Sequence, residues 1–261
     1  MTEFDIIEEA GFKYMEMGNN SEDTPLLLLH GLFGTASNFD AVIREFSKKM
    51  RVVLPILPIF EMPIKKLTVK GLMDYFASFV EYKGYRKIHM LGNSLGGHIA
   101  LMYVLQNQKM VESLTLTGSS GLFENAFGSG FPRREDYEYI KRKIELTFYD
   151  ASIATKEMVD EVFSIVNDRS RAIRIIRIAK SAIRHNVGEQ LHEVKQPTLL
   201  VWGKQDTITP PFVAEKFHEL LPNSELVFLD KCGHAPMLEI PEKFNEAQGK
   251  FLSQFLVSSS D

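Results

Sequence analysis

The sequence has 261 residues, of which 44% are hydrophobic and 25% are charged, with 30 basic and 34 acidic side chains. These proportions are ordinary for a globular protein, and the length suits one α/β domain that buries roughly three quarters of its unfolded surface. The net charge of −4 and the pI near 6.0 give no reason to expect nucleic acid or an anionic membrane as a partner. The one cysteine, Cys232, excludes an internal disulfide and favours a reducing compartment.

The N-terminus and the hydropathy pattern bear on location. The first nine residues are acidic rather than basic, so they do not resemble a secretory signal. No apolar run approaches the ~20 residues that a membrane-spanning helix needs. We therefore expect a soluble, cytoplasmic protein.

Strand and helix patterns alternate along most of the chain. Residues 4–18 alternate loosely between Gly11 and Gly18, which predicts an opening antiparallel ribbon. Buried strands are predicted at 25–29, 52–57, 88–91, 114–117, 198–202 and 225–229, and helices at 37–50, around 72–80, and at 97–106, 211–221 and 241–256. Continuous apolar strands that alternate with helices are typical of a mostly parallel, doubly wound α/β sheet.

The alternation is interrupted in the middle of the chain. From 122 to 194 no buried strand is evident, and helices are predicted near 135–148, 156–166 and 169–184. We therefore expect a core domain made of residues 1–121 and 191–261, with a helical cap inserted at 122–190. Such a cap would lie above the carboxyl ends of the strands, where sheets of this kind hold their ligands.

The most informative stretch is 87–100. Apolar residues at 88–91 predict a strand, residues 92–96 read Gly-Asn-Ser-Leu-Gly, and a helix follows. Gly-x-Ser-x-Gly between a strand and a helix is the nucleophile-elbow pattern, in which the turn exposes the serine hydroxyl. The two glycines leave room for strand and helix to approach Ser94 closely.

A serine hydroxyl needs a base to take its proton, and the base needs an acid to orient it. Asp206 follows one buried strand, and His234 follows the next one in a Gly-His-Ala-Pro loop. Both loops leave the same edge of the predicted sheet as Ser94, so the three side chains can meet. Asp230 is a weaker candidate for the acid, because only four residues separate it from His234.

The other histidines have simpler explanations. We expect His30 to hold its glycine loop by hydrogen bonding and His98 to pack against the core, while His89 lies inside a strand. His185, His192 and His218 are not in a glycine-bounded loop.

Stabilising the oxyanion requires two backbone N–H donors. One is expected from Leu95, directly after the nucleophile. The other is expected from the loop at 30–34, where Leu32 is the first choice and Phe33 the reserve. That loop is not a phosphate loop, because no Gly-Lys-Ser/Thr ending follows it.

Four motifs occur in order: His-Gly-x-x-Gly at 30–34, Gly-Asn-Ser-Leu-Gly-Gly at 92–97, Leu-Leu-Val-Trp-Gly-Lys-Gln-Asp at 199–206, and Gly-His-Ala-Pro at 233–236 with Glu-Ile-Pro-Glu-Lys-Phe at 239–244. Together they resemble the α/β-hydrolase superfamily over nearly the whole chain outside the cap. The resemblance implies Ser94 as nucleophile, Asp206 as acid and His234 as base, the positions that the residues already indicate. The chain also resembles small carboxylesterases and the carbon–carbon bond hydrolases of meta-cleavage pathways. A serine at the elbow argues against the haloalkane dehalogenase and epoxide hydrolase branches, whose nucleophile there is aspartate.

One segment departs from the family pattern, and a second segment has an unusual charge. Where many relatives have Asp-x-x-Gly-x-Gly after the second parallel strand, residues 54–63 are apolar and rich in proline. The predicted helix 169–184 carries six basic residues and no acidic one. We expect these basic side chains to be solvated, opposite a packed face made of Ala172, Ile175, Ile176, Ala179 and Ile183; recruitment of anionic substrates is the alternative.

Some single residues have two interpretations. Phe123, Phe127 and Phe131 could line an entrance or pack the cap. Cys232 is expected to be a small buried side chain.

The sequence therefore predicts a serine hydrolase that cleaves a small to medium carboxylic ester, or a related acyl compound, through an acyl-enzyme. Two alternatives remain: a meta-cleavage type carbon–carbon bond hydrolase, and a non-catalytic binding protein or receptor on the same fold. We expect no metal and no organic cofactor, a small-molecule acyl substrate, and no nucleic-acid or membrane partner. A homodimer is left open.

Overall fold

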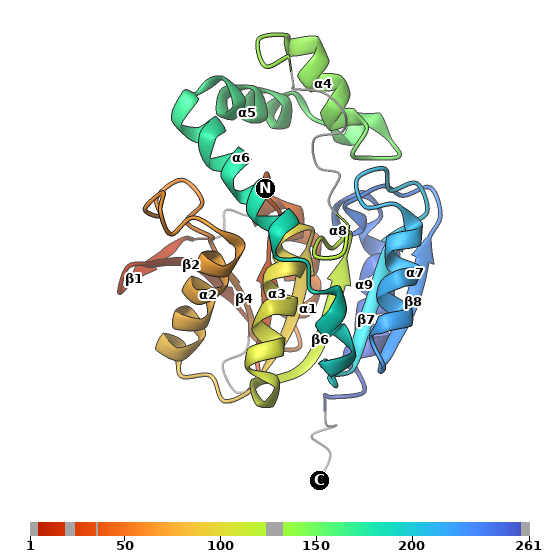
Figure 1. Ribbon diagram of the computed structural model, residues 1–261. Coiled ribbons are helices and arrows are strands. Elements are labelled where there is room, and N and C mark those ends of the chain that lie inside the picture. Colours follow the sequence, from red (N-terminus) through yellow and green to blue (C-terminus); the bar gives the residue numbers. More distant parts are fainter. Residues whose placement is uncertain (1–4, 19–23, 35, 124–132, 257–261) are drawn as a thin grey trace.

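A computed structural model of the protein describes residues 5–18, 24–34, 36–123 and 133–256. In these residues eight strands form one sheet, in the order β1-β2-β4-β3-β5-β6-β7-β8, with helices on both faces (Figure 1). The strands are β1 (Ile7–Glu9), β2 (Phe12–Met17), β3 (Leu26–Leu29), β4 (Val52–Pro55), β5 (Ile88–Asn93), β6 (Val111–Thr117), β7 (Thr198–Gly203) and β8 (Ser224–Leu229).

The direction of the strands agrees with the sequence pattern. β1 pairs with β2, and β2 with β4, in antiparallel fashion, whereas every pairing from β4 to β8 is parallel. The expected opening ribbon and mostly parallel sheet are confirmed. Because parallel strands end at one edge, the loops after β3, β4, β5, β7 and β8 all leave the sheet on the same side.

Burial on both faces explains the uninterrupted run of leucines in β3. All four residues of this strand have no exposed surface. Successive side chains of a strand point to opposite faces. Accordingly, Leu27 and Leu29 belong to a cluster that contains Phe76, and Leu26 and Leu28 belong to a second cluster with Phe46.

The helices around the sheet form two layers. Residues from α2, α3 and α7 join the first cluster, and residues from α1 and α9 join the second. These helices are η1 (Ala36–Phe39), α1 (Asp40–Phe46), α2 (Val69–Lys83), α3 (Leu95–Gln106), η2 (Gln108–Met110), η4 (Gly188–Glu193), α7 (Pro211–Leu220), α8 (Pro236–Glu239) and α9 (Pro241–Leu252). The helix predicted at 37–50 ends at Phe46, the helix predicted at 241–256 ends at Leu252, and the strand predicted at 52–57 ends at Pro55.

The middle of the chain is helical, as the sequence predicts. It contains α4 (Tyr137–Glu145), η3 (Ala151–Ile153), α5 (Lys156–Asn167) and α6 (Arg169–Arg184). Figure 1 shows α4 and α5 away from the sheet, at the top of the view, and α6 running from them back toward the core. At the core, the Val69 amide at the start of α2 donates to Ser181 Oγ of α6 over 3.0 Å.

The packed face of α6 differs from the predicted one. Ile175 and Ala179 are buried as expected, but Ile176 and Ile183 are 36% and 58% exposed. Ile178 and Ala182 are buried in their place. The helix is rotated toward this side because Ser181 faces α2, a contact that the spacing of apolar residues does not reveal.

None of the described helices has both the length and the apolar character that crossing a membrane requires.

Gly96, the second glycine of Gly-x-Ser-x-Gly, has no room for a side chain. A Cβ on Gly96 would lie 2.0 Å from the Leu29 carbonyl oxygen, whereas a Cβ on Gly249 in α9 would have no neighbour nearer than 3.9 Å. We predict that Gly96→Ala lowers the free energy of unfolding by about 1–3 kcal/mol or more, through overpacking. Gly249→Ala, in contrast, should raise it by up to about 1 kcal/mol, because alanine is the better helix former. Urea denaturation measures both values, and equal effects would contradict the close approach at Gly96.

Candidate active site

Ser94 lies at the turn between β5 and α3 in a strained conformation. Its backbone angles are φ 54° and ψ −118°, and a positive φ is unusual for a residue with a side chain. Its amide donates to the Thr117 carbonyl of β6 over 3.1 Å, which fixes the turn on the sheet. Ser94 occupies the N-cap position of α3, yet its side chain makes no capping hydrogen bond. The hydroxyl of a serine at this position commonly caps the helix, but that of Ser94 does not.

The loop after β3 packs directly against this turn. A Cβ on Gly31 would lie 3.2 Å from Ser94 Cβ, so Gly31 brings the main chain of the loop against the serine. Leu32, the next residue, is half-buried, and Phe33 is 41% exposed. Among the described residues, the amides of Leu32 and Leu95 donate to no backbone carbonyl. Leu95 begins α3, so its amide is one of those that a helix leaves unpaired at its start.

His30 fixes the shape of the same loop. The Leu57 amide donates to His30 Nε2 over 3.2 Å, so Nε2 carries no proton, and Nδ1–H donates to the Gly31 carbonyl at 2.8 Å. Burial lowers the pKa of His30, which keeps the ring neutral and suited to this pairing. The expectation that His30 holds its glycine loop by hydrogen bonding is confirmed.

Asp206 is held in the loop after β7. Its Oδ1 accepts from the amides of Ile208 at 2.8 Å and Thr209 at 2.9 Å. Its Oδ2 accepts from the Thr209 hydroxyl at 2.9 Å and lies 2.9 Å from His234 Nδ1. The side chain of Asp206 has no exposed surface, so these four bonds supply the compensation that a buried carboxylate needs.

The hydrogen bond to Asp206 determines the tautomer of His234. A carboxylate only accepts, so Nδ1 of His234 carries a proton, and in the neutral ring Nε2 then keeps its lone pair. Asn93, the residue before Ser94, donates through Nδ2 to the His234 carbonyl at 3.2 Å and to the Thr117 carbonyl at 3.0 Å. The histidine loop is thereby hydrogen-bonded to the turn that carries Ser94.

The competing residues are engaged elsewhere. Asp230 is exposed and accepts from Gln205 Nε2 at 3.2 Å. His98 Nε2 donates to the His185 carbonyl at 2.7 Å, and His89 Nδ1 lies 2.7 Å from Ser113 Oγ. Burial lowers the pKa of each of these two histidines to about 4. Cys232 is buried, as expected, and burial strongly raises the pKa of its thiol.

The apolar segment that departs from the family pattern is held by α6. Arg174 Nη1 donates to the Met62 carbonyl at 2.6 Å and to the Ile59 carbonyl at 3.3 Å. Arg177 donates to the carbonyls of Leu67 at 3.1 Å and Lys65 at 3.2 Å. We call these contacts, between Arg174, Arg177 and residues 59–67, the arginine clamp. Part of the basic face of α6 is therefore engaged with main-chain oxygens instead of being solvated throughout.

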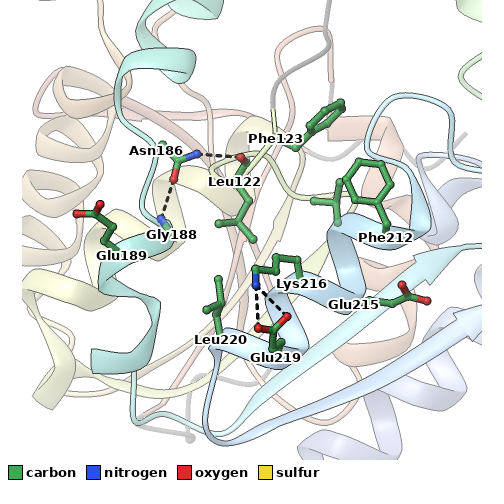
Figure 2. A pocket seen from close by; sticks show the side chains of 11 residues that line it. Leu122, Phe123, Asn186, Gly188, Glu189, Phe212, Glu215, Lys216, Glu219 and Leu220 are labelled. Atoms are coloured by element: carbon green, nitrogen blue, oxygen red, sulfur yellow. Dashed lines mark hydrogen bonds and ion pairs between the residues drawn. The ribbon is translucent and has the colours of Figure 1, made fainter.

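A groove of about 770 Å³ lies where the helical segment joins the core, beside α7. Figure 2 shows Asn186 bonded to Leu122 and to Gly188, which ties the entering and leaving chains together. Phe123 packs edge-on against Phe212 of α7, with ring centres 5.3 Å apart. Ser94, Asp206 and His234 are not among the residues that line this groove. Phe127 and Phe131 lie outside the described residues.

In the ranges that the structure describes, no three His, Cys, Asp or Glu side chains are grouped as a metal site requires. Thr209 bonds Asp206, and Asn93 bonds the His234 carbonyl; neither residue was among those expected from the sequence. Their positions in the sequence could have indicated these roles, because Asn93 lies inside Gly-x-Ser-x-Gly and Thr209 follows Asp206 by three residues.

Comparison with known proteins gives the family. Residues 24–241 match the model of the α/β hydrolase fold family. The chain belongs to this family. The protein is 41% identical to MGS-MChE2, an α/β hydrolase from the metagenome of lagoon sediments at Mar Chica, Morocco, with 96% of this chain and 98% of that chain covered and a TM-score of 0.79.

Two curated relatives extend the comparison. The hydrolase YugF of Bacillus subtilis, described as uncharacterized, is 27% identical, with 92% of this chain and 93% of that protein aligned. The 2-hydroxy-6-oxononadienedioate/2-hydroxy-6-oxononatrienedioate hydrolase of Burkholderia vietnamiensis is also 27% identical, over 94% of this chain and 91% of that protein. This chain is an α/β hydrolase, and the expected fold and family are confirmed.

The arginine clamp gives a prediction for the segment 59–67. A hydrogen bond to a charged group contributes about 1.5–3 kcal/mol. In Arg174→Met we therefore expect the protected amides of this segment, such as that of Met62, to exchange with deuterium roughly tenfold faster or more. Lys180→Met is the matched control, because Lys180 is exposed on the same helix and has no hydrogen bond or ion pair within the described residues. Mass spectrometry of exchanged peptides measures both, and equal exchange in the two variants would show that the clamp does not hold the segment.

Proposed function

We propose that this hydrolase is a serine esterase that cleaves small to medium carboxylic esters, or related acyl compounds, through an acyl-enzyme. Ser94 is the nucleophile, His234 the base, and Asp206 the acid that orients the base. The observation that carries the proposal is the buried 2.9 Å hydrogen bond from His234 Nδ1 to Asp206, whose loops leave the same sheet edge as the strained Ser94 turn. That bond leaves Nε2 of His234 as the atom able to take a proton from Ser94.

Each step then follows from these atoms. Ser94 Oγ attacks the carbonyl carbon while His234 Nε2 takes its proton, and the carbonyl oxygen becomes an oxyanion. The Leu32 and Leu95 amides stabilise that oxyanion, and the imidazolium is stabilised by Asp206. His234 gives its proton to the departing alcohol, which leaves the acyl group on Ser94. Water, activated by Nε2, then releases the acid and restores the serine. The reaction written in this way needs no metal or organic cofactor.

In this proposal the helical segment in the middle of the chain is a cap over the active site. We propose that residues 122–190 form a cap inserted between two parts of the core, 1–121 and 191–261, and that the cap shapes the binding site. Apolar side chains from the cap and the core belong to one large cluster, against which Leu32 also packs. Those that the proposal uses are Leu57, Phe60, Met62, Leu122 and Ile175. An uncharged acyl chain suits such surroundings.

The triad assignment gives a direct prediction. We expect a fluorophosphonate to add one adduct to the wild-type protein and none to Ser94→Ala, as read by intact-mass spectrometry. Asp206→Asn should lower kcat for a p-nitrophenyl ester by roughly 10⁴-fold, because it disturbs the histidine tautomer. Asp230→Asn is the control and should leave kcat unchanged. An adduct on folded Ser94→Ala, or equal losses for the two aspartate variants, would contradict the assignment.

A carbon–carbon bond hydrolase is the second candidate, because the relative from Burkholderia vietnamiensis acts on a dienedioate. A dianionic substrate calls for cationic side chains in the site. Two arginines of α6 that reach the core instead donate to the carbonyls of residues 59–67. This arrangement favours an ester as substrate.

Competing substrates separate these two activities. We predict that kcat/KM for a p-nitrophenyl ester of a short fatty acid exceeds that for a dienedioate ring-cleavage product by at least tenfold, since the arginine clamp leaves Arg174 and Arg177 engaged. Ring-cleavage products are coloured, so spectrophotometry follows both reactions. A higher kcat/KM for the dienedioate would make the carbon–carbon bond hydrolase the correct choice.

The third candidate is a binding protein that keeps the fold without turnover. Its signature would be a folded wild-type protein that neither accepts a fluorophosphonate nor hydrolyses an activated ester at a rate above that of Ser94→Ala.

A further inference from the structure

The segment Leu146–Asp150, which follows α4, contacts both loops that carry the acid and the base. We call it the docking segment. The hydroxyl of Thr207, next to Asp206, donates to the Leu146 carbonyl at 2.8 Å. The backbone amide of His234 donates to the Thr147 carbonyl, also at 2.8 Å. The helical segment and the two loops are therefore joined by main-chain oxygens of the docking segment.

Glu239, in α8, is bonded to both sides of this contact. Its two carboxylate oxygens accept from the Tyr149 amide at 2.9 and 3.1 Å, and Oε1 accepts from the Asp150 amide at 3.4 Å. The same two oxygens accept from the Gly233 amide, at 3.2 Å each. One carboxylate thus bridges the docking segment and the residue immediately before His234.

Packing at Gly233 shows how closely the two parts approach. A Cβ on Gly233 would lie 2.5 Å from the Thr147 carbonyl oxygen and 2.8 Å from Phe148 Cα. Only glycine leaves room for the docking segment to lie on the histidine loop. Glu239 is half-buried, and burial raises its pKa while the amides of Gly233, Tyr149 and Asp150 act to lower it. The carboxylate needs these three donors, since it has lost part of its hydration.

We propose that Glu239 is a positioning residue for His234, which holds the histidine loop on the docking segment so that the imidazole is aligned for proton transfer. The proposal rests on the proposed function in that His234 is taken as the base. Glu239 acts through the backbone of Gly233 and His234 and does not touch the reacting atoms. It makes the helical segment a part of the catalytic apparatus, because the His234 amide is bonded to that segment and to no other described carbonyl.

The expected size of the effect follows from geometry. Misplacing a catalytic group by about 1 Å can cost 10²-fold in rate. In Glu239→Gln one oxygen becomes an NH₂ group, which cannot accept from the amides that both oxygens now serve. We expect kcat to fall by about 10- to 100-fold while KM changes by less than about twofold, because the substrate contacts are untouched.

Glu242→Gln is the matched control, since Glu242 is an exposed glutamate three residues further along the chain. It should retain the wild-type kcat and KM. Circular dichroism and thermal unfolding would establish that each variant is folded. A fall in melting temperature with kcat unchanged would overturn the proposal, because it would give Glu239 a structural role alone.

A second readout does not depend on turnover. The proton on His234 Nδ1, held by a buried carboxylate, should give a downfield ¹H NMR resonance that is absent from His234→Ala. We expect this resonance to shift or broaden in Glu239→Gln and to stay unchanged in Glu242→Gln. An unchanged resonance in Glu239→Gln would overturn the proposal.

The two readouts separate this proposal from the proposed function. If the wild-type protein has no esterase activity and takes no fluorophosphonate adduct, the proposed function fails, while the resonance still reports whether Glu239 fixes His234. If the wild-type protein is active, kcat and the resonance must both change in Glu239→Gln.

Discussion

The hydrogen bond between Asp206 and His234 joins two loops that are separated along the chain by a helix, α7, and a strand, β8. A 2.9 Å contact of this kind forms only when both loops are placed by the sheet beneath them. β7 and β8 are parallel neighbours whose last residues, Gly203 and Leu229, are paired in register. A Cβ on Gly203 would lie 2.1 Å from the Gly233 carbonyl oxygen, so the loops touch through their main chains. The carboxylate is buried, and it is therefore stable only while the histidine and the turn of residues 206–209 supply its donors.

Much of this arrangement could be predicted from the sequence, because the signals are local. Four consecutive leucines in β3 indicate a strand buried on both faces, and the structure gives them no exposed surface. The glycines around Ser94 mark a turn where two backbones meet. The sequence favours Asp206 over Asp230, because a residue four positions before His234 cannot easily fold back to it; in the structure Asp206 Oδ2 lies 2.9 Å from His234 Nδ1, and Asp230 accepts from Gln205.

Other features could not be predicted, because they depend on which segments meet in three dimensions. The spacing of isoleucines in α6 suggested that Ile176 and Ile183 are buried, whereas the contact between Ser181 and α2 turns a different face inward. The sequence suggests that Arg174 is solvated, because its partners Ile59 and Met62 are more than 100 residues away in the chain. Glu239 opens the stretch 239–244 that resembles the family, but the sequence does not show its partners, because Tyr149 and Gly233 are 84 residues apart in the chain.

Several hydrogen bonds between the helical segment and the core have a side chain on one side and the main chain on the other. The core side chains of Thr207 and Glu239 bond main-chain atoms of the docking segment, and Arg174 and Arg177 of α6 bond main-chain oxygens of residues 59–67. Main-chain acceptors and donors are present whatever side chain a position carries. These hydrogen bonds therefore do not depend on which side chains the docking segment and residues 59–67 carry, although Ile59 and Leu67 also attach their segment by being buried. Because the acceptors are main-chain carbonyls, the loops of Asp206 and His234 keep these two bonds to the docking segment whatever side chains Leu146 and Thr147 are replaced by.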